Sequence, residues 1–345
     1  MADQHFRGRS RMATMNDVAA LAGVSPSTVS YVMTGKRPIG EATRRKVLAA
    51  AKELNWEPNS RARALRSSHS NTLALVGPAR THAYAEVQGA LVYALAQAAE
   101  DQGYDLLLKT TGAEPKDMVS LARSSVADAV ILTDVLLEDP RVEKLRTLSF
   151  PMVLVGRPTE SQHLNWVDLD FFGAGRATVD RLADLGHRVI AFFGPPPSAY
   201  KLQAGYAVRT LEGAREAALR RGVRLVAPPT TESLDGFADE VESAFRSAPE
   251  VTGVILQYEP ATALIPQILA GLGRSIPDDV SIIAIAPSQL AMHARPPIDY
   301  VELQLTQMAQ YAVRFAVDSI EGADPQSVLL PAEITNLGSV RQLSR

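Results

Sequence analysis

The chain has 345 residues, of which 46% are hydrophobic, so it is long enough for two or three domains with buried cores. It contains no cysteine, which excludes disulfide bonds, thiolate zinc sites and cysteine nucleophiles. No apolar run approaches the roughly 18 residues of a membrane span. The arginine-containing N-terminus lacks the apolar stretch of a secretion signal, so we expect a cytoplasmic protein.

Charge is distributed unevenly along the chain. Residues 1–70 hold 12 basic and 5 acidic residues, a net charge of +7, whereas residues 71–345 carry a net charge of −10. A basic head on an acidic body favours contact of the head alone with a polyanion such as nucleic acid. Chance clustering of solvated surface charges would produce the same asymmetry, so it does not decide by itself.

Residues 12–57 have the pattern of a small helical domain, preceded by a polar, aperiodic tail over residues 1–11 that we expect to be disordered. A first helix is expected from about Asn16 to Ala22. Thr14 would cap it, with Asp17 as the partner in a capping box.

A second and a third helix follow in the same domain. Gly23 permits a tight turn, after which Ser25 caps the second helix and Pro26 occupies its first position. A third helix is expected from about Glu41 to Leu54. The expected core consists of the apolar positions Val18, Leu21, Val24, Val29, Val32, Val47, Leu48, Ala51 and Leu54. Two short helices joined this way form a helix-turn-helix, a unit that inserts its second helix into the DNA major groove.

Residues 58–70 have a different character. Pro58 ends the helical unit, residues 59–66 form a possible short helix, and residues 67–71 read as a polar linker.

From residue 71 onward the pattern changes to strands that alternate with helices. The strands are expected at Leu73–Val76, Asp105–Leu108, Ala129–Leu132, Met152–Val155, Val189–Phe193, Arg224–Val226, Val254–Leu256 and Ser281–Ile285. The helices are expected near 84–102, 116–124, 172–185, 206–221, 236–247 and 261–272. This alternation predicts an α/β body with parallel sheets covered on both faces. Eight strands over this length fit either one barrel or two smaller sheets.

Sequence patterns for catalysis are missing from the whole chain. The six histidines lack metal-binding spacing, and we find no phosphate-binding loop, no dinucleotide-binding loop and no serine nucleophile elbow. We therefore expect neither an enzyme nor a bound cofactor or metal.

A family resemblance rests on many residues in register. The matching pieces in the first part are Asp17-Val18-Ala19, Leu21-Ala22-Gly23-Val24-Ser25, Thr28-Val29-Ser30, Thr43-Arg44, Val47-Leu48-Ala49-Ala50, Glu53-Leu54, Pro58-Asn59, Ala62-Arg63-Ala64-Leu65 and Leu73-Ala74-Leu75-Val76. Those in the body are Leu185-Gly186-His187-Arg188-Val189-Ile190-Ala191-Phe192, Gly194, Leu211-Glu212-Gly213, Ile276-Pro277-Asp278-Asp279-Val280-Ser281 and Pro296-Pro297. With these segments the chain resembles the LacI/GalR family of repressors over nearly its whole length.

The resemblance implies a particular organisation. The body would have two periplasmic-binding-protein-like lobes with a ligand cleft between them, and the chain would cross between the lobes near residues 170 and 298. The N-lobe would comprise about 71–170 and 298–327, and the C-lobe about 171–297 and 328–340. The resemblance also implies a homodimer.

Candidate DNA contacts come from the head. The resemblance places base reading on the exposed start of the second helix, at Pro26, Ser27 and Tyr31, with Thr28 and Ser30 nearby. A hydroxyl can pair with either a donor or an acceptor on a base edge, and the Tyr31 ring can pack on a thymine methyl group, although an ordinary half-buried tyrosine is the alternative. The candidates for phosphate contacts, which otherwise are solvated surface residues or caps, are Asn16, Ser25, Lys36, Arg37 and Arg44.

The segment 59–66 matches the family's hinge helix, which the resemblance places in the minor groove of the operator. Leu65 would wedge into the central base step and bend the DNA. The flanking candidates are Asn59, Arg61, Ala62, Arg63 and Arg66. An isolated helix this short is unstable in water, so we expect it to form only on DNA, which would let a ligand bias its formation.

The cleft is where the sequence departs from the family pattern. Sugar-sensing members carry an arginine, an Asn-Asp pair and an aspartate at positions matched here by Thr210, by Tyr258-Glu259 and by Ala286. Arg209 is displaced by one position, a rotation of about 100° on a helix, so it need not face the cleft. The cleft candidates by position are Pro78, Arg80, Tyr84, Arg157, Tyr200, Arg209, Thr210, Gln257, Tyr258 and Ala286. The absence of these multidentate side chains disfavours a simple monosaccharide, and it leaves a less polar or aromatic metabolite, a ligand held differently or no small ligand as alternatives.

Together these features predict a dimeric, sequence-specific DNA-binding regulator, of the repressor type, whose affinity for a pseudo-palindromic operator is switched by a small effector. An alternative keeps the DNA-binding role but gives the body a protein partner and no metabolite. A periplasmic solute-binding protein would need a signal sequence in place of residues 1–70. A sugar kinase fused to a helix-turn-helix would need glycine-rich phosphate loops.

Overall fold

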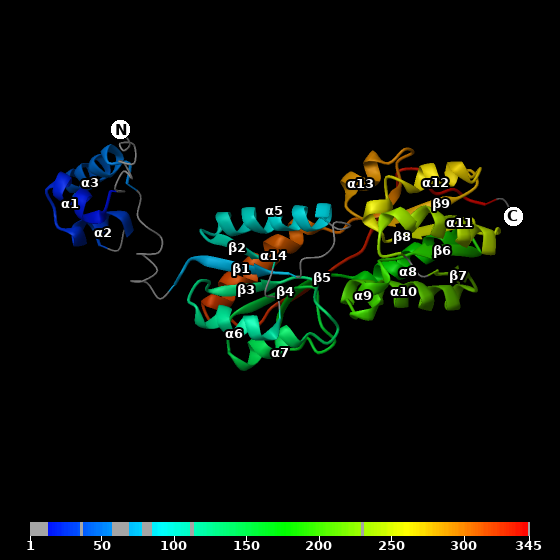
Figure 1. The fold of residues 1–345 in the computed structure, drawn as a ribbon, viewed down its shortest axis with the longest axis horizontal. Coiled ribbons are helices and arrows are strands. Elements are labelled where there is room, and N and C mark those ends of the chain that lie inside the picture. The colour runs from blue at the N-terminus through cyan, green and yellow to red at the C-terminus, as the bar shows by residue number, and fades with distance from the viewer. Residues whose placement is uncertain are drawn as a thin grey trace, which may run out of the picture. The chain divides into compact units, whose positions relative to one another are not determined.

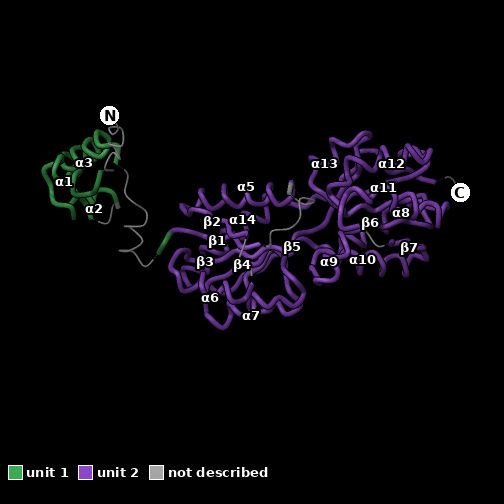
Figure 2. Tube along the Cα trace, viewed as in Figure 1, with its two compact units in different colours: residues 1–70 green, residues 71–345 purple. Residues whose placement is uncertain are grey.

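A computed structural model of the chain describes residues 13–34, 37–56, 69–77, 85–110, 114–228 and 231–343. The chain forms two compact units, Met1–Ser70 and Asn71–Arg345 (Figure 2). Within the described ranges, every helix is too short or too polar to cross a membrane.

The first unit contains the three expected helices, α1 (Met15–Ala22), α2 (Pro26–Thr34) and α3 (Glu41–Glu53). The predicted capping box is confirmed, because the Thr14 hydroxyl accepts from the Asp17 amide and the Asp17 carboxylate accepts from the Thr14 amide at 2.7 Å. Gly23 adopts the left-handed conformation with φ of 67°, which lets the chain turn from α1 into α2.

Small residues dominate the core of this unit: Val18, Ala19, Val29, Val47, Ala50 and Ala51. Two predicted core residues are wrong, since Leu21 and Leu48 are 47% and 45% exposed. The alanines let the short helices approach closely. Leu21 and Leu48 lie outside the resulting contacts between the helices. The expected hinge helix over 59–66 lies outside the described residues.

The second unit contains two sheets of six strands each, which decides between the barrel and the two-sheet alternatives in favour of two sheets. The first, in the spatial order β11-β5-β4-β3-β1-β2, contains β1 (Thr72–Val76), β2 (Asp105–Lys109), β3 (Ala129–Leu132), β4 (Met152–Val155), β5 (Asn165–Leu169) and β11 (Ser327–Leu330). The second, in the order β12-β10-β9-β8-β6-β7, contains β6 (Val189–Phe193), β7 (Arg224–Val226), β8 (Gly253–Leu256), β9 (Ser281–Ile285), β10 (Asp299–Val301) and β12 (Ile334–Thr335). All pairings are parallel except that of β12 with β10.

Helices cover both faces of each sheet (Figure 1). Successive strand residues point to opposite faces, so Leu73 and Leu75 pack in one core cluster with α5 and α14, and Ala74 and Val76 in another with α6 and α7. The helices of the first sheet are α5 (Ala85–Asp101), α6 (Pro115–Arg123), α7 (Pro140–Thr147) and α14 (Leu305–Ile320). Those of the second are α8 (Phe171–Asp184) and α10 (Gly205–Arg221) on one face, and α11 (Phe237–Ser247), α12 (Ile265–Gly271) and α13 (Ser288–His293) on the other.

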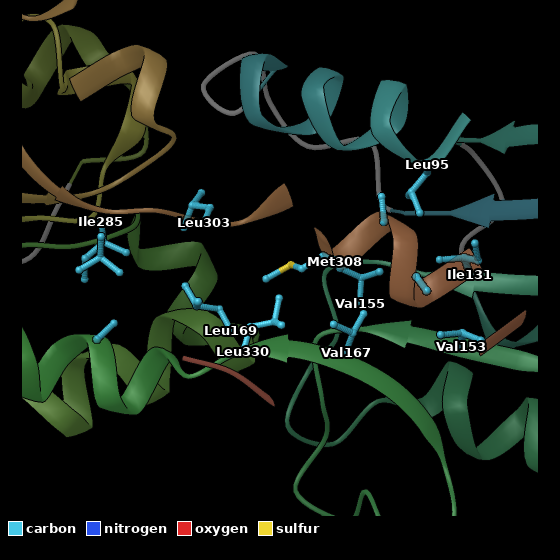
Figure 3. Packing of buried hydrophobic residues seen from close by; sticks show 14 of the residues in the cluster. Leu95, Ile131, Val153, Val155, Val167, Leu169, Ile285, Leu303, Met308 and Leu330 are labelled. Atoms are coloured by element: carbon cyan, nitrogen blue, oxygen red, sulfur yellow. The ribbon is translucent and has the colours of Figure 1, made fainter. Parts of the chain in front are cut away.

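The chain crosses between the two sheets three times: after β5, between β10 and α14, and between β11 and β12. The second and third crossings lie a few residues beyond the expected positions, because β10 belongs to the second sheet and β11 to the first. One continuous apolar cluster runs from Leu95 and Ile131 through Met308 and Leu303 to Ile285 (Figure 3), so the core extends across the crossings.

Two glycines allow α8 and α10 to pack closely and thereby set the position of α10. A Cβ atom on Gly213 would lie 2.0 Å from the Phe172 carbonyl oxygen, and one on Gly175 would lie 2.1 Å from the Thr210 carbonyl oxygen. Both helices are thus held with their backbones in contact, and the N-terminal half of α10 is presented to the first sheet.

Candidate nucleic-acid interface and ligand cavity

The start of α2 presents a group of hydroxyl side chains to solvent. Ser25, Pro26 and Ser27 are exposed, and Thr28 is partly buried. The Ser25 hydroxyl oxygen lies 2.7 Å from that of Ser27 and 2.9 Å from that of Thr28, and it also accepts from the Thr28 amide at 3.2 Å. Ser25 therefore both caps α2 and holds the neighbouring hydroxyls together.

Tyr31 lies one helical turn beyond Ser27 and is half-buried, as is Ser30. The guanidinium carbon of Arg37 lies 5.7 Å from the centre of the Tyr31 ring, within cation–π range, so these two candidates are adjacent. Asn16 and Arg44 are exposed on α1 and α3. The remaining predicted DNA contacts lie outside the described residues: Lys36, Asn59, Arg61, Ala62, Leu65 and Arg66.

A cavity of about 390 Å³ opens between the two lobes of the second unit. Its walls come from the carboxyl ends of the first sheet's strands, from α5, from the start of α10 and α14, and from Glu259 after β8. Ligand sites in open α/β sheets usually lie at the carboxyl ends of the parallel strands, where the strand order reverses. Half of its lining residues are aliphatic or aromatic: Leu75, Val87, Leu91, Val92, Leu108, Val135, Val155, Phe171, Tyr206, Leu303, Leu305 and Met308.

Arg209 on α10 reaches from the second lobe to the first along this wall. Its Nη1 donates to the Arg157 carbonyl oxygen at 2.9 Å, and its Nη2 donates to the Pro158 carbonyl oxygen at 3.4 Å. Arg209 Nη1 and Arg157 Nε each lie 3.6 Å from Asp168 Oδ2 on β5. These contacts form an Arg–Asp–Arg cluster, defined here as Arg157, Asp168 and Arg209, that connects the lobes.

The electrostatics of this cluster are dominated by burial. Asp168 is almost completely buried, and desolvation raises its pKa to about 7 even though both arginines favour the ionised form. The Arg157 guanidinium carbon also lies 5.4 Å from the centre of the Trp166 ring, within cation–π range.

Thr210 and Gln257 bond to each other and do not line the cavity. Thr210 is fully buried, and its hydroxyl donates to the Tyr206 carbonyl oxygen at 2.8 Å. The Gln257 amide donates to Thr210 Oγ1 at 3.0 Å. The one-residue displacement noted in the sequence therefore turns Thr210 inward, while Arg209 does face the cavity.

Three further cleft candidates lie in packed regions away from the cavity lining. Tyr258 is fully buried against Phe237, with ring centroids 5.5 Å apart, and Ala286 is buried in the same cluster. Tyr200 packs with Leu136 and with alanines of the second lobe. The candidates Pro78, Arg80 and Tyr84 lie outside the described residues.

The predicted cleft candidates omitted three acidic residues that line the cavity, Asp134, Asp168 and Glu259. Glu259 is 8% exposed, and burial raises its pKa to about 8. Its position directly after the end of a buried strand was the available signal. Asp168 lies inside a strand that the apolar pattern did not predict.

The helix-turn-helix unit, the two parallel-sheet lobes and the cavity between them define a class of protein: a DNA-binding transcription regulator with a periplasmic-binding-protein-like body. Residues 14–59 match the model of bacterial regulatory proteins of the lacI family, and residues 179–340 match that of the periplasmic binding protein-like domain.

Known relatives extend over nearly the whole chain. The HTH-type transcriptional regulator CelR of Thermobifida fusca is 32% identical over 336 residues, covering 94% of this chain and 97% of the relative. The ribose operon repressor of Escherichia coli (strain K12) is 28% identical, covering 90% and 93%. The chain belongs to the LacI family of bacterial transcription regulators, and these relatives are regulators rather than enzymes.

Solved structures agree with this assignment. A CelR–cellobiose complex matches with a TM-score of 0.66 at 27% identity, covering 95% of this chain and 99% of that one. The lac repressor dimer bound to operator and the anti-inducer ONPF matches the fold with a TM-score of 0.80 at 19% identity, covering 96% and 100%.

Proposed function

We propose that this protein is a homodimeric repressor that reads a pseudo-palindromic operator, one head per half-site, and that responds to a small effector bound in the cavity between its lobes. The proposal assigns DNA binding to residues 12–57, a hinge to 58–70 and effector binding with dimerisation to 71–345. It would act in the cytoplasm, at the nucleoid.

The DNA-reading part of the proposal rests on the start of α2. Its hydroxyl group cluster and Tyr31 present donors and acceptors on one exposed surface, and hydroxyls can pair with either kind of group on a base edge. Arg37 and Arg44 supply positive charge for phosphate contacts. Leu65 in the hinge is proposed as the residue that wedges into the central base step.

The switching part rests on one observation above all, the Arg–Asp–Arg cluster that joins the two lobes at the cavity wall. A ligand in this cavity contacts both lobes, so it can favour one angle between them over another. A ligand changes such an equilibrium only by its difference in affinity for the two states. The interlobe contacts of Arg209 are the element through which that difference would act.

Selection of bound fragments from random duplex DNA by the full-length protein tests the DNA-binding role. We expect enriched sequences with twofold symmetry, and Leu65→Ala is expected to weaken binding and reduce bending in a gel-phasing assay. Enriched sequences that lack twofold symmetry would contradict the dimeric reading of the operator. Bending that is unchanged in Leu65→Ala would contradict the wedge.

The enriched fragment then serves to test the switch. A metabolite panel that includes cellobiose and ribose is expected to contain a compound that changes operator affinity. If operator affinity responds to no compound while an immobilised body captures a defined protein partner, the body is a protein-docking module instead.

A further inference from the structure

Glu259 is a buried carboxyl group with unused hydrogen-bonding capacity at the wall of the cavity. It begins the short helix Glu259–Ala261 after β8, it is 8% exposed, and its Oε2 has no hydrogen-bond partner. No basic side chain of the described residues lies within ion-pair distance of it. A buried acceptor in this state is costly unless a ligand satisfies it.

The cavity's two arginines do not neutralise Glu259. Both lie beside Asp168, and Arg209 also donates to two backbone carbonyl groups. The charged group that affects Glu259 most is the Asp134 carboxylate, whose repulsion raises the pKa of Glu259 further. Among the described residues, the acidic and basic lining comprises Asp134, Arg157, Asp168, Arg209 and Glu259, so ionisation of Glu259 leaves this part of the wall with one negative charge in excess.

The remainder of the wall suits an apolar molecule with few hydroxyl groups. Val155, Leu303 and Met308 line it, and the polar pair Thr210 and Gln257 is bonded internally. Beyond the polar lining residues Gln88, Thr110 and Thr133, a polyhydroxylated ligand would place hydroxyls against aliphatic groups without partners, which is unfavourable. Arg209 already donates to two carbonyl groups, whereas Arg157 Nε lies 3.6 Å from Asp168 and has no hydrogen-bond partner. An anionic ligand would therefore have one arginine donor, but it would also meet the carboxyl groups of Asp134 and Glu259.

We propose that the effector is a mainly apolar amine whose cationic nitrogen pairs with Glu259. The inference rests on the proposed function and names the ligand class of its cavity. The apolar part of the amine would occupy the aliphatic part of the cavity, and its ammonium group would pair with the Glu259 carboxylate, which has no cationic partner among the described residues. Since the empty site favours the protonated carboxyl group, binding the cation would displace that proton into solvent.

Three probes of one shape test the ligand class: 2-phenylethylamine, 2-phenylethanol and phenylacetate, together with cellobiose. Isothermal titration calorimetry of the full-length protein in two buffers of different ionisation enthalpy measures both affinity and proton release. We expect the amine to bind most tightly and to release close to one proton at pH 7. Its affinity should rise about tenfold from pH 6 to pH 7 and level off above the pKa of Glu259, because only the ionised carboxylate pairs with it.

Two variants locate the effect. Glu259→Gln keeps the shape of the side chain, and it should weaken amine binding at least tenfold and abolish proton release. Glu100→Gln, an exposed carboxyl group on α5, is the control and should change neither. Circular dichroism of each variant verifies folding before titration.

Several results would overturn the inference. These are binding of the alcohol, phenylacetate or cellobiose as tight as that of the amine, unchanged amine binding by Glu259→Gln, or no amine binding at millimolar concentration. If a neutral sugar changes operator affinity while the amine does not, the ligand class is wrong and the effector-switched function stands. If no ligand of any class alters operator binding, the proposed function itself fails.

Discussion

Replacing Arg209 by methionine removes the guanidinium group that joins the lobes while keeping an unbranched side chain. The variant loses a charged hydrogen bond of 2.9 Å to the Arg157 carbonyl oxygen, a weaker one of 3.4 Å to that of Pro158, and an ion pair at 3.6 Å with Asp168. Hydrogen bonds to charged groups contribute about 1.5–3 kcal/mol each. Asp168 keeps its second partner, Arg157, so no buried charge is left alone.

We therefore expect the free energy of unfolding of the larger unit to fall by about 2–3 kcal/mol, since the freed carbonyl groups face a cavity that water can enter. With an unfolding entropy of about 2.1 cal/mol/K per residue, this corresponds to a decrease in Tm of about 4–5 °C. Differential scanning calorimetry of the full chain measures it. The ligand-dependent change in operator affinity should be smaller in the same variant, because the lobes are no longer joined at the cavity wall.

Arg215→Met is the matched control, because Arg215 lies exposed on the same helix and should leave Tm within about 1 °C. Equal Tm values for Arg209→Met and Arg215→Met would refute the role of the Arg209 contacts in holding the lobes together. If Arg209→Met loses stability but keeps the full ligand-dependent change in operator affinity, Arg209 has a structural role only.

Three other changes test separate parts of the molecule. Gly213→Ala places a methyl group 2.0 Å from the Phe172 carbonyl oxygen, so α8 and α10 must separate, and we expect loss of stability by more than about 2 kcal/mol in chemical denaturation. For Asp168, the folded pKa of about 7 lies above the ordinary value, so its contribution to stability is complete at low pH and is lost as pH rises through about 7. Asp168→Asn should remove that part of the decline between pH 4 and 7, and an unchanged slope would contradict the assignment. Tyr31→Ala should relax base preference more than it lowers nonspecific affinity in competition binding, whereas an equal loss on all sequences would make Tyr31 a structural residue.

The helices of the N-terminal unit could be predicted from the sequence because local side-chain interactions set their boundaries. The Thr14 hydroxyl, the Asp17 carboxylate and the left-handed turn at Gly23 act within a few residues of each other, so their pattern predicts the helix boundaries directly. The buried strands β1, β3, β4, β6, β8 and β9 of the body were equally readable, because a strand covered on both faces is a largely continuous apolar run. The strands β5, β10, β11 and β12 escaped prediction, since Asp168, Asp299 and Ser327 interrupt the apolar pattern of the first three and β12 is only two residues long.

The long helix α14 was also missed, and its first residue follows Gln304 in a left-handed conformation, without a side-chain cap to mark the start. Two crossings between the lobes lie a few residues beyond their predicted positions, because the sheet in which β10 and β11 pair could not be predicted. Strand order depends on hydrogen bonds between segments far apart in sequence, and a periodic pattern contains no information about the partner.

The site shows the same division between local and distant contributions. The amino-acid sequence determined a helix-turn-helix, a basic head and an α/β body that departs from the family's sugar-binding pattern at Thr210 and Ala286. Only the tertiary structure decided that Arg209 faces the cavity and that Thr210 does not. It also decided that Asp168 and Glu259 are buried carboxyl groups at the cavity wall. Burial, and the pKa shift that follows from it, depends on which distant segments cover a side chain.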